Sequence, residues 1–134
     1  MKRTKLAATI VFLLCFLLCA HLAAFALRLY WFLWWYDGLL HFIAGIVLGL
    51  AYIYFVPIFF ARRSRIANLL LFTLWIAAIG LGWEVFEYAY NISVSIEGYM
   101  VDTITDVVAD TIGGILGYFM ALRIIGRMPG ENEK

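Results

Sequence analysis

The chain has 134 residues, of which 66% are hydrophobic and only 14% are charged. Soluble globular domains are about 45–50% apolar and about 25% charged, so this composition excludes an ordinary soluble domain and predicts a polytopic membrane protein. The formal net charge of +1 gives no sign of a nucleic-acid partner. The partner that we expect is the lipid bilayer.

The first predicted span covers about residues 6–27 and follows a basic start that carries Lys2, Arg3 and Lys5. A spanning helix needs about 20 apolar residues. The basic start and the Ala-rich end of this run also fit a signal peptide, but its apolar stretch is longer than the roughly 7–15 residues of a signal core, which favours a retained helix. A lone histidine in such a helix, His21, is expected to be packed or hydrogen-bonded rather than a ligand.

Two cysteines, Cys15 and Cys19, lie one helical turn apart in this first span. The chain has no CxxC pair and no cysteine–histidine spacing typical of zinc sites. We therefore expect both thiols to be buried as small apolar groups and not to form a disulfide.

An aromatic segment, residues 28–36 (RLYWFLWWY), follows the first span. Tryptophan and tyrosine rings settle at the headgroup level of a bilayer. The segment therefore marks one membrane face, either as a short interfacial helix or as a tight turn between spans.

The second predicted span covers residues 37–60 and opens with Asp37 and His41, one helical turn apart. Gly45 and Gly49 continue the same i, i+4 series. Residues at this spacing share one face of a helix, and small residues on such a face let a neighbouring helix approach closely. We expect this face to point into the bundle, with the glycines packing within one chain or between copies in a homo-oligomer.

The third predicted span covers residues 66–90, and Glu84 and Glu87 lie near its end on one face. The fourth covers residues 101–125 and is the most unusual. Asp102, Asp106 and Asp110 follow one another at intervals of four and form a stripe of carboxylates in an otherwise apolar helix.

Charged groups inside a span are costly and usually functional.

The four spans together predict that residues 1–127 form a single four-helix transmembrane domain and that residues 128–134 form a disordered tail.

The basic residues predict the orientation of the bundle. Lys and Arg concentrate in the cytoplasmic loops of membrane proteins. Most of them here flank the same ends of the spans, namely Lys2, Arg3, Lys5, Arg62, Arg63, Arg65, Arg123 and Arg127. Both termini are therefore expected in the cytoplasm, and every acidic residue within a span falls in the outer half of the membrane.

The negative charge of so many carboxylates in one layer of the membrane could be compensated in three ways: by protonation of some of them, by a water-filled cavity, or by a divalent cation. Carboxylates with an imidazole are typical ligands for divalent cations. The metal hypothesis assigns the ligands to Asp37, His41, Glu84, Asp106 and Asp110. In a hydrolytic version, Glu87 or Asp102 would activate water as a general base.

Structural explanations exist for the shallower acids. Asp37 and Asp102 each begin a span, where the helix dipole favours a negative charge. Glu84 and Glu87 could lie at the membrane interface among aromatic residues. These explanations do not cover the deeper set, which consists of His41, Glu84, Asp106 and Asp110.

The order of these motifs resembles that of VanZ-like membrane proteins and of the related inner-membrane group that includes YjdF. The matching residues are Asp37 and His41 in YDGLLHF, Glu84 and Glu87 in WEVFE, and Asp102, Asp106 and Asp110 in DTITDVVADTIGGILG. The resemblance covers the last three spans and implies a small bacterial inner-membrane protein. VanZ-like proteins are associated with glycopeptide resistance.

The chain departs from the VanZ-like pattern toward greater acidity. That pattern has a Lys at the position of Gly38, a Gln at Glu87 and an Asn at Asp110, and it has an Arg before the aspartates that residues 98–101 lack. These differences place the chain nearer the YjdF-like group and favour a cation site over a self-neutralised network of ion pairs.

The sequence therefore predicts an all-α integral membrane protein with four spans and an acidic pocket on the non-cytoplasmic side. Its leading function is to bind a divalent metal ion of unknown identity and to hold or act on a lipid or envelope-linked substrate. Two alternatives stay open: a component of cation or proton transport, and a scaffold with a structural polar network.

Overall fold

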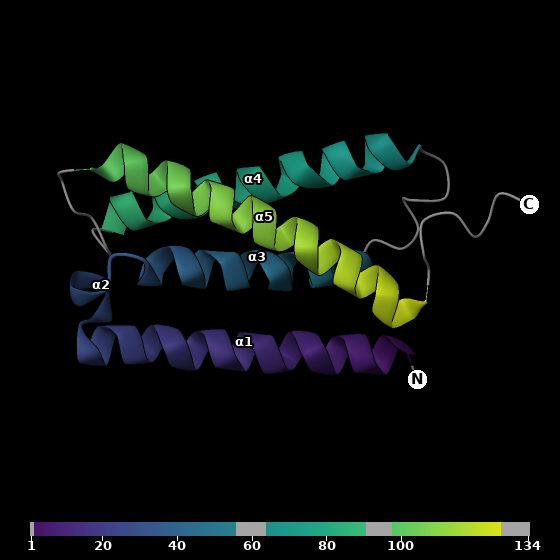
Figure 1. Ribbon diagram of the computed structural model, residues 1–134, viewed down its shortest axis with the longest axis horizontal. Helices are drawn as coiled ribbons and strands as arrows, with labels where there is room; N and C mark the ends of the chain where they lie inside the picture. Colours follow the sequence, from purple (N-terminus) through teal and green to yellow (C-terminus); the bar gives the residue numbers. More distant parts are fainter. Residues whose placement is uncertain (1, 56–63, 91–97, 127–134) are drawn as a thin grey trace, which may run out of the picture.

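The computed structural model describes residues 2–55, 64–90 and 98–126. Every regular element in these ranges is a helix: α1 (Lys2–Leu27), α2 (Leu29–Phe32), α3 (Tyr36–Phe55), α4 (Arg65–Tyr90) and α5 (Tyr99–Ile125) (Figure 1). Four helices are long and apolar enough to cross a membrane, as predicted: Lys2–Leu27, Tyr36–Phe55, Ile66–Tyr90 and Met100–Ile125. The predicted end of the second span at residues 56–60 and the predicted tail at 128–134 lie outside the described residues.

The start of α1 and the end of α5 lie at the same end of the bundle (Figure 1). A side chain at Gly126, which caps α5 in a left-handed conformation, would contact the ammonium group of Lys2. The spans therefore run alternately up and down, as four successive crossings require.

At the opposite end of the bundle, the aromatic segment forms the short helix α2. Arg28 ends α1 in a left-handed conformation with φ of 55° and turns the chain toward α2. Trp31, Phe32 and Trp34 are largely exposed, which suits aromatic side chains at a membrane interface. Of the two predicted arrangements, the short helix is the one found.

Glycines bring α3 and α5 together, and this is the most extensive helix contact in the bundle. At four glycines an added Cβ would collide with backbone of the other helix: Gly45 with Asp110, Gly49 with Gly114, Gly113 with Phe42, and Gly117 with Ile46. The Gly45–Gly49 face of α3 and the Gly113–Gly117 face of α5 thus pack against each other within one chain. These glycines are therefore not available for the pairing between copies of the chain, which the sequence left open.

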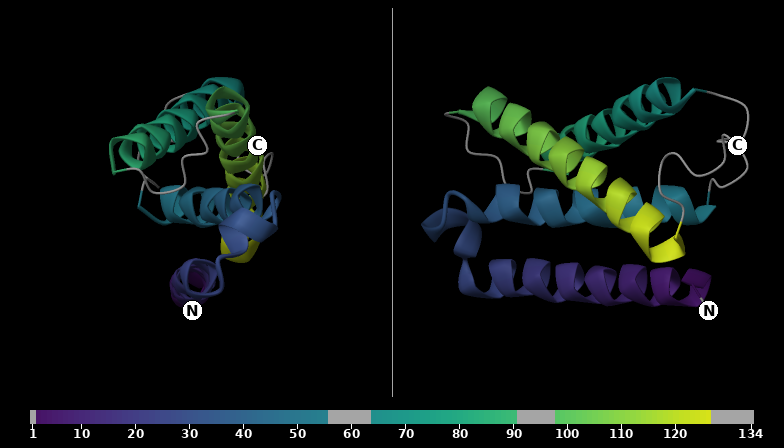
Figure 2. Two further views of the ribbon diagram at one scale, coloured as in Figure 1. Left: turned by 90° about the vertical axis from the view of Figure 1, so that its left-hand side faces the viewer. Right: turned by 45° about the vertical axis from the view of Figure 1, so that its right-hand side comes forward.

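Helix α1 is peripheral, and most of its large side chains are exposed. It packs mainly on α3 and lies on the opposite side of α3 from α4 (Figure 2). Cys15 and Cys19 are free and exposed. The predicted absence of a disulfide is confirmed, whereas the predicted burial is wrong, because both thiols lie on a face of α1 that no other described helix covers.

The two ends of the bundle differ in chemistry. Near the start of α1 the helices enclose an apolar core that includes Leu6, Leu50, Phe72 and Ala121. Asn68 is the one buried polar residue described toward this end of the bundle. The other buried polar side chains gather near the end that carries α2.

Candidate functional site

Three helices each contribute one buried polar side chain to a common point near the α2 end of the bundle. His41 comes from the second turn of α3, Glu84 from the last turns of α4, and Asp106 from the first half of α5. One possible ligand atom from each lies within 4.8 Å of the others. The sequence predicted this convergence from the alternating direction of the spans.

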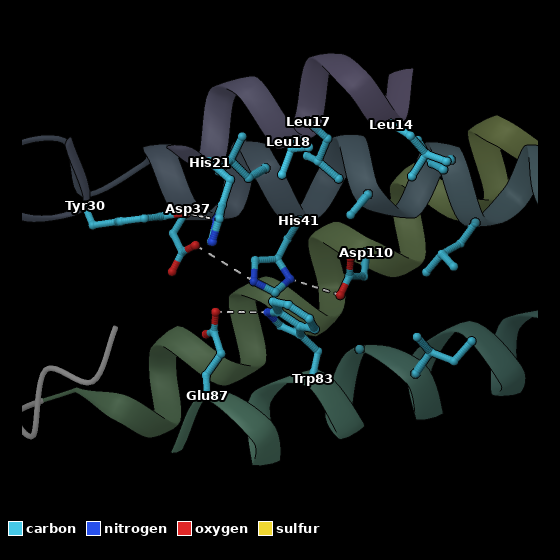
Figure 3. Close-up of a pocket in the computed structure, with 16 residues that line it drawn as sticks. Leu14, Leu17, Leu18, His21, Tyr30, Asp37, His41, Trp83, Glu87 and Asp110 are labelled. Atoms are coloured by element: carbon cyan, nitrogen blue, oxygen red, sulfur yellow. Dashed lines mark hydrogen bonds and ion pairs between the residues drawn. The ribbon is translucent and has the colours of Figure 1, made fainter. Parts of the chain in front are cut away.

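His41 lies at the centre of the group (Figure 3). Its Nδ1 is 3.0 Å from Oδ2 of Asp110, a hydrogen-bond distance. Its Nε2 is 3.7 Å from Oε1 of Glu84 and 3.9 Å from Oδ1 of Asp37, both too long for hydrogen bonds. Two atoms bound to one ion at about 2.1 Å each lie within about 4.2 Å of one another, so both distances are compatible with a shared ion.

Asp110 occupies the opposite side of the imidazole from the other carboxylates. An ionised carboxylate only accepts hydrogen bonds, so Nδ1 of His41 donates to it, and Nε2 is left facing Glu84 and Asp37, where it can bind an ion. Helix α4 comes close at this point, since a Cβ on Gly80 would lie 2.7 Å from Oδ2 of Asp110. Metal-bound histidines are commonly held by a carboxylate in this way, which makes Asp110 better suited to orient His41 than to bind an ion beside it.

The remaining three predicted site residues adjoin the central group. Asp37 and Glu87 lie close enough to His41 to form a second possible ligand set, and Asp37, Asp102 and Asp106 form a third. All seven side chains singled out in the sequence are therefore brought together. Which of them bind an ion or act as a base stays a prediction.

Two hydrogen-bond donors fix the glutamates. Thr103 donates its hydroxyl to Oε2 of Glu84 at 2.9 Å, and Trp83 donates its indole N–H to Oε1 of Glu87 at 2.9 Å (Figure 3). The sequence analysis did not single out Trp83 as a donor, although the spacing of four residues between Trp83 and Glu87 places the two on one helix face.

A cavity of about 420 Å³ adjoins the acidic group on the side of α1 (Figure 3). Its polar residues are His21, Tyr30, Asp37, His41, Glu87 and Asp110. The rest of its lining is mainly apolar and includes Leu14, Leu17, Leu18, Ala44, Val47, Leu48, Ile79 and Trp83. The sequence predicted a pocket built by the last three spans, and the structure adds α1 and α2 as further walls.

Tyr30 and His21 close one side of this cavity. The Tyr30 hydroxyl lies 2.6 Å from Nδ1 of His21, which confirms the hydrogen-bonded role expected for that histidine. Burial, and then the negative charge of Asp37, raise the pKa of the Tyr30 phenol above its ordinary value. The phenol is therefore neutral at physiological pH and can donate to His21.

A family described as predicted membrane protein (DUF2238) matches residues 1–127. The chain belongs to this family. The match includes all four spans and every residue of the acidic group, so the DUF2238 region contains the whole candidate site. Searches of curated proteins and of solved structures found no match to the chain. Membership of DUF2238, together with the four long apolar helices, supports a multi-pass membrane protein and assigns no activity to it.

Proposed function

We propose that this DUF2238 protein holds one divalent cation between His41, Glu84 and Asp106 and presents it to a lipid or envelope-linked substrate. The observation that carries the proposal is the convergence of these three buried side chains from three helices, with ligand atoms within 4.8 Å of one another. Three protein ligands leave coordination positions open for water or substrate, as catalytic metal sites do.

The donor set indicates the kind of ion. Imidazole nitrogen suits zinc and iron, and carboxylate oxygen suits manganese, magnesium and calcium. A mixed site with one imidazole and two carboxylates favours a divalent first-row metal such as Mn²⁺, Fe²⁺ or Zn²⁺. Asp110 would hold His41 in the tautomer that leaves Nε2 free for the ion.

The proposed location is the outer half of the cell (inner) membrane, with both termini in the cytoplasm. The basic residues around the other end of the bundle support this orientation. The resemblance to VanZ-like and YjdF-like proteins supports an envelope role. The catalytic version of the proposal is hydrolysis, for which Glu87, at the cavity wall, or Asp102 would serve as the general base and the ion would supply the charge that activates water.

Passage of cations or protons through the bundle has less support. Ion and proton pathways through membranes are marked by polar or ionisable groups in the bundle interior. Among the described residues, Asn68 is the only buried polar side chain outside the acidic group, and an apolar core fills the bundle near it. This distribution favours holding an ion over passing it.

Metal content tests the proposal directly. Protein purified from membranes without chelator should contain about one divalent metal ion per chain by elemental mass spectrometry. Asp106→Asn should lower this content at least tenfold, because loss of a charged ligand typically removes most of the affinity of such a site.

Thr105→Val is the matched control. Thr105 precedes Asp106 on α5 and is exposed, and its side-chain hydrogen bonds among the described residues go to its own helix backbone, at Val101 and Asp102. The Thr105→Val variant should keep the metal content of the unaltered protein. The proposal would be overturned if the unaltered protein contained no metal, or if Asp106→Asn and Thr105→Val contained equal amounts of metal.

A further inference from the structure

The cavity beside the acidic group is polar at one end and apolar along the rest of its length. Along α3 its lining runs from Asp37 to Leu48, a rise of about 16 Å at 1.5 Å per residue. This is about half of the roughly 30 Å hydrocarbon core of a bilayer. The cavity thus begins with the acids and follows the bundle inward for about the depth of one leaflet.

Leucines of α1 form the outer wall of the apolar part. Leu14, Leu17 and Leu18 line the cavity together with Val47 and Leu48 of α3. The leucines come from the most peripheral helix of the bundle, which lies apart from α4 (Figure 2). A hydrocarbon chain is the occupant that such a wall accepts inside a membrane, because neither water nor a polar ligand is stable against it.

The charged groups at the polar end of the cavity are predominantly negative. Asp37, Glu87 and Asp110 contribute carboxylates, whereas none of the sixteen lining residues described is a lysine or arginine. Aromatic rings of Trp83 and Tyr30 stand beside these acids. Carboxylates combined with aromatic faces attract an ammonium group, through charge and through cation–π contact, and repel a headgroup that carries only phosphate.

We propose that the cavity binds a membrane lipid with a primary-amine headgroup, with one acyl chain along the leucines of α1 and the ammonium group near Asp37 and Glu87. The lipid enters sideways from the leaflet. The lipid proposal names a substrate class for the site described under the proposed function. Binding of the lipid does not require the metal ion, and only a reaction of the bound lipid rests on the proposed function. The volume of about 420 Å³ lies within the range of about 300–1,000 Å³ that small-molecule sites have.

Native mass spectrometry of the purified protein can test the headgroup. The protein is mixed with phosphatidylethanolamine and with its N-acetylated form, which has the same chains and phosphate but no ammonium charge. We expect at least tenfold greater retention of the amine lipid. Glu87→Gln keeps an acceptor for the Trp83 indole and should reduce this preference to about twofold or less. Equal retention of the two lipids by the unaltered protein would overturn the proposal.

A second pair of variants tests the acyl-chain part of the site. Leu18 and Leu22 are both on α1 and are 59% and 58% exposed, but only Leu18 lines the cavity. Leu18→Trp should lower retention of phosphatidylethanolamine at least fivefold, and Leu22→Trp should leave it unchanged. Equal retention by the two variants, each verified as folded by circular dichroism, would contradict the assigned chain position.

Metal content measured on the same samples separates the two proposals. An amine preference in metal-free protein supports the lipid site and removes the metal centre. Bound metal without an amine preference removes the lipid site and leaves the metal centre standing.

Discussion

Gly113→Val is expected to prevent stable folding of the bundle. A Cβ at Gly113 would collide with the backbone carbonyl of Phe42 in α3, and backbone cannot move aside as a flexible side chain can. The two helices would have to separate along their closest contact, which also positions His41 against Asp110. Overpacking of this kind costs about 3 kcal/mol or more, and the free energy of unfolding in detergent micelles should fall by that amount.

Gly82→Val is the control for this prediction. Gly82 is exposed on α4, and a Cβ there meets nothing within 4 Å. The free energy of unfolding should change by less than about 0.5 kcal/mol, as for most surface substitutions. If the two variants were equally stable, the intramolecular packing of α3 on α5 would be wrong.

His41→Leu is expected to be the most damaging substitution within the acidic group. Asp110 would lose its hydrogen-bond donor, and Asp37 and Glu84 would lose the imidazole that stands between them. Removing one partner of a buried charged network costs about 3–5 kcal/mol, because the remaining charges stay buried without compensation. Unfolding measured in metal-free micelles should show this loss, and bound metal should disappear as well.

The other histidine of the chain provides the comparison. His21 is partly buried, and its described side-chain hydrogen bond is the one with Tyr30. His21→Leu should cost about 1 kcal/mol, the typical net value of one hydrogen bond. Equal costs at the two histidines would show that His41 does not hold the carboxylates together.

The sequence was sufficient to predict the layer in which the acids lie. Spans can be recognised from composition and length, and helical spacing assigns Asp37, His41, Gly45 and Gly49 to one face. The alternation of up and down spans then brings the start of α3, the end of α4 and the start of α5 to one end of the bundle. The structure confirms this arrangement, because it depends only on helix geometry and topology.

Details that depend on side-chain packing could not be predicted. Helix α1 is apolar on every side, so no periodicity indicates which face meets the bundle. The leucine wall of the cavity and the exposure of Cys15 and Cys19 were therefore missed. The hydrogen bond between Asp110 and Nδ1 of His41 depends on how α3 and α5 cross, which the glycines determine. The sequence spacing showed only that Asp110 and Asp106 lie on the same face of one helix.

His41, Glu84 and Asp106 are proposed to bind one ion in common. The most direct measurement is X-ray diffraction from crystals of the protein grown with Mn²⁺, with anomalous differences collected at the manganese edge. We expect one anomalous peak about 2.0–2.3 Å from Nε2 of His41 and from a carboxylate oxygen of Glu84 and of Asp106. A peak elsewhere, no peak at this position, or side chains of Glu84 and Asp106 directed toward lipid would contradict it.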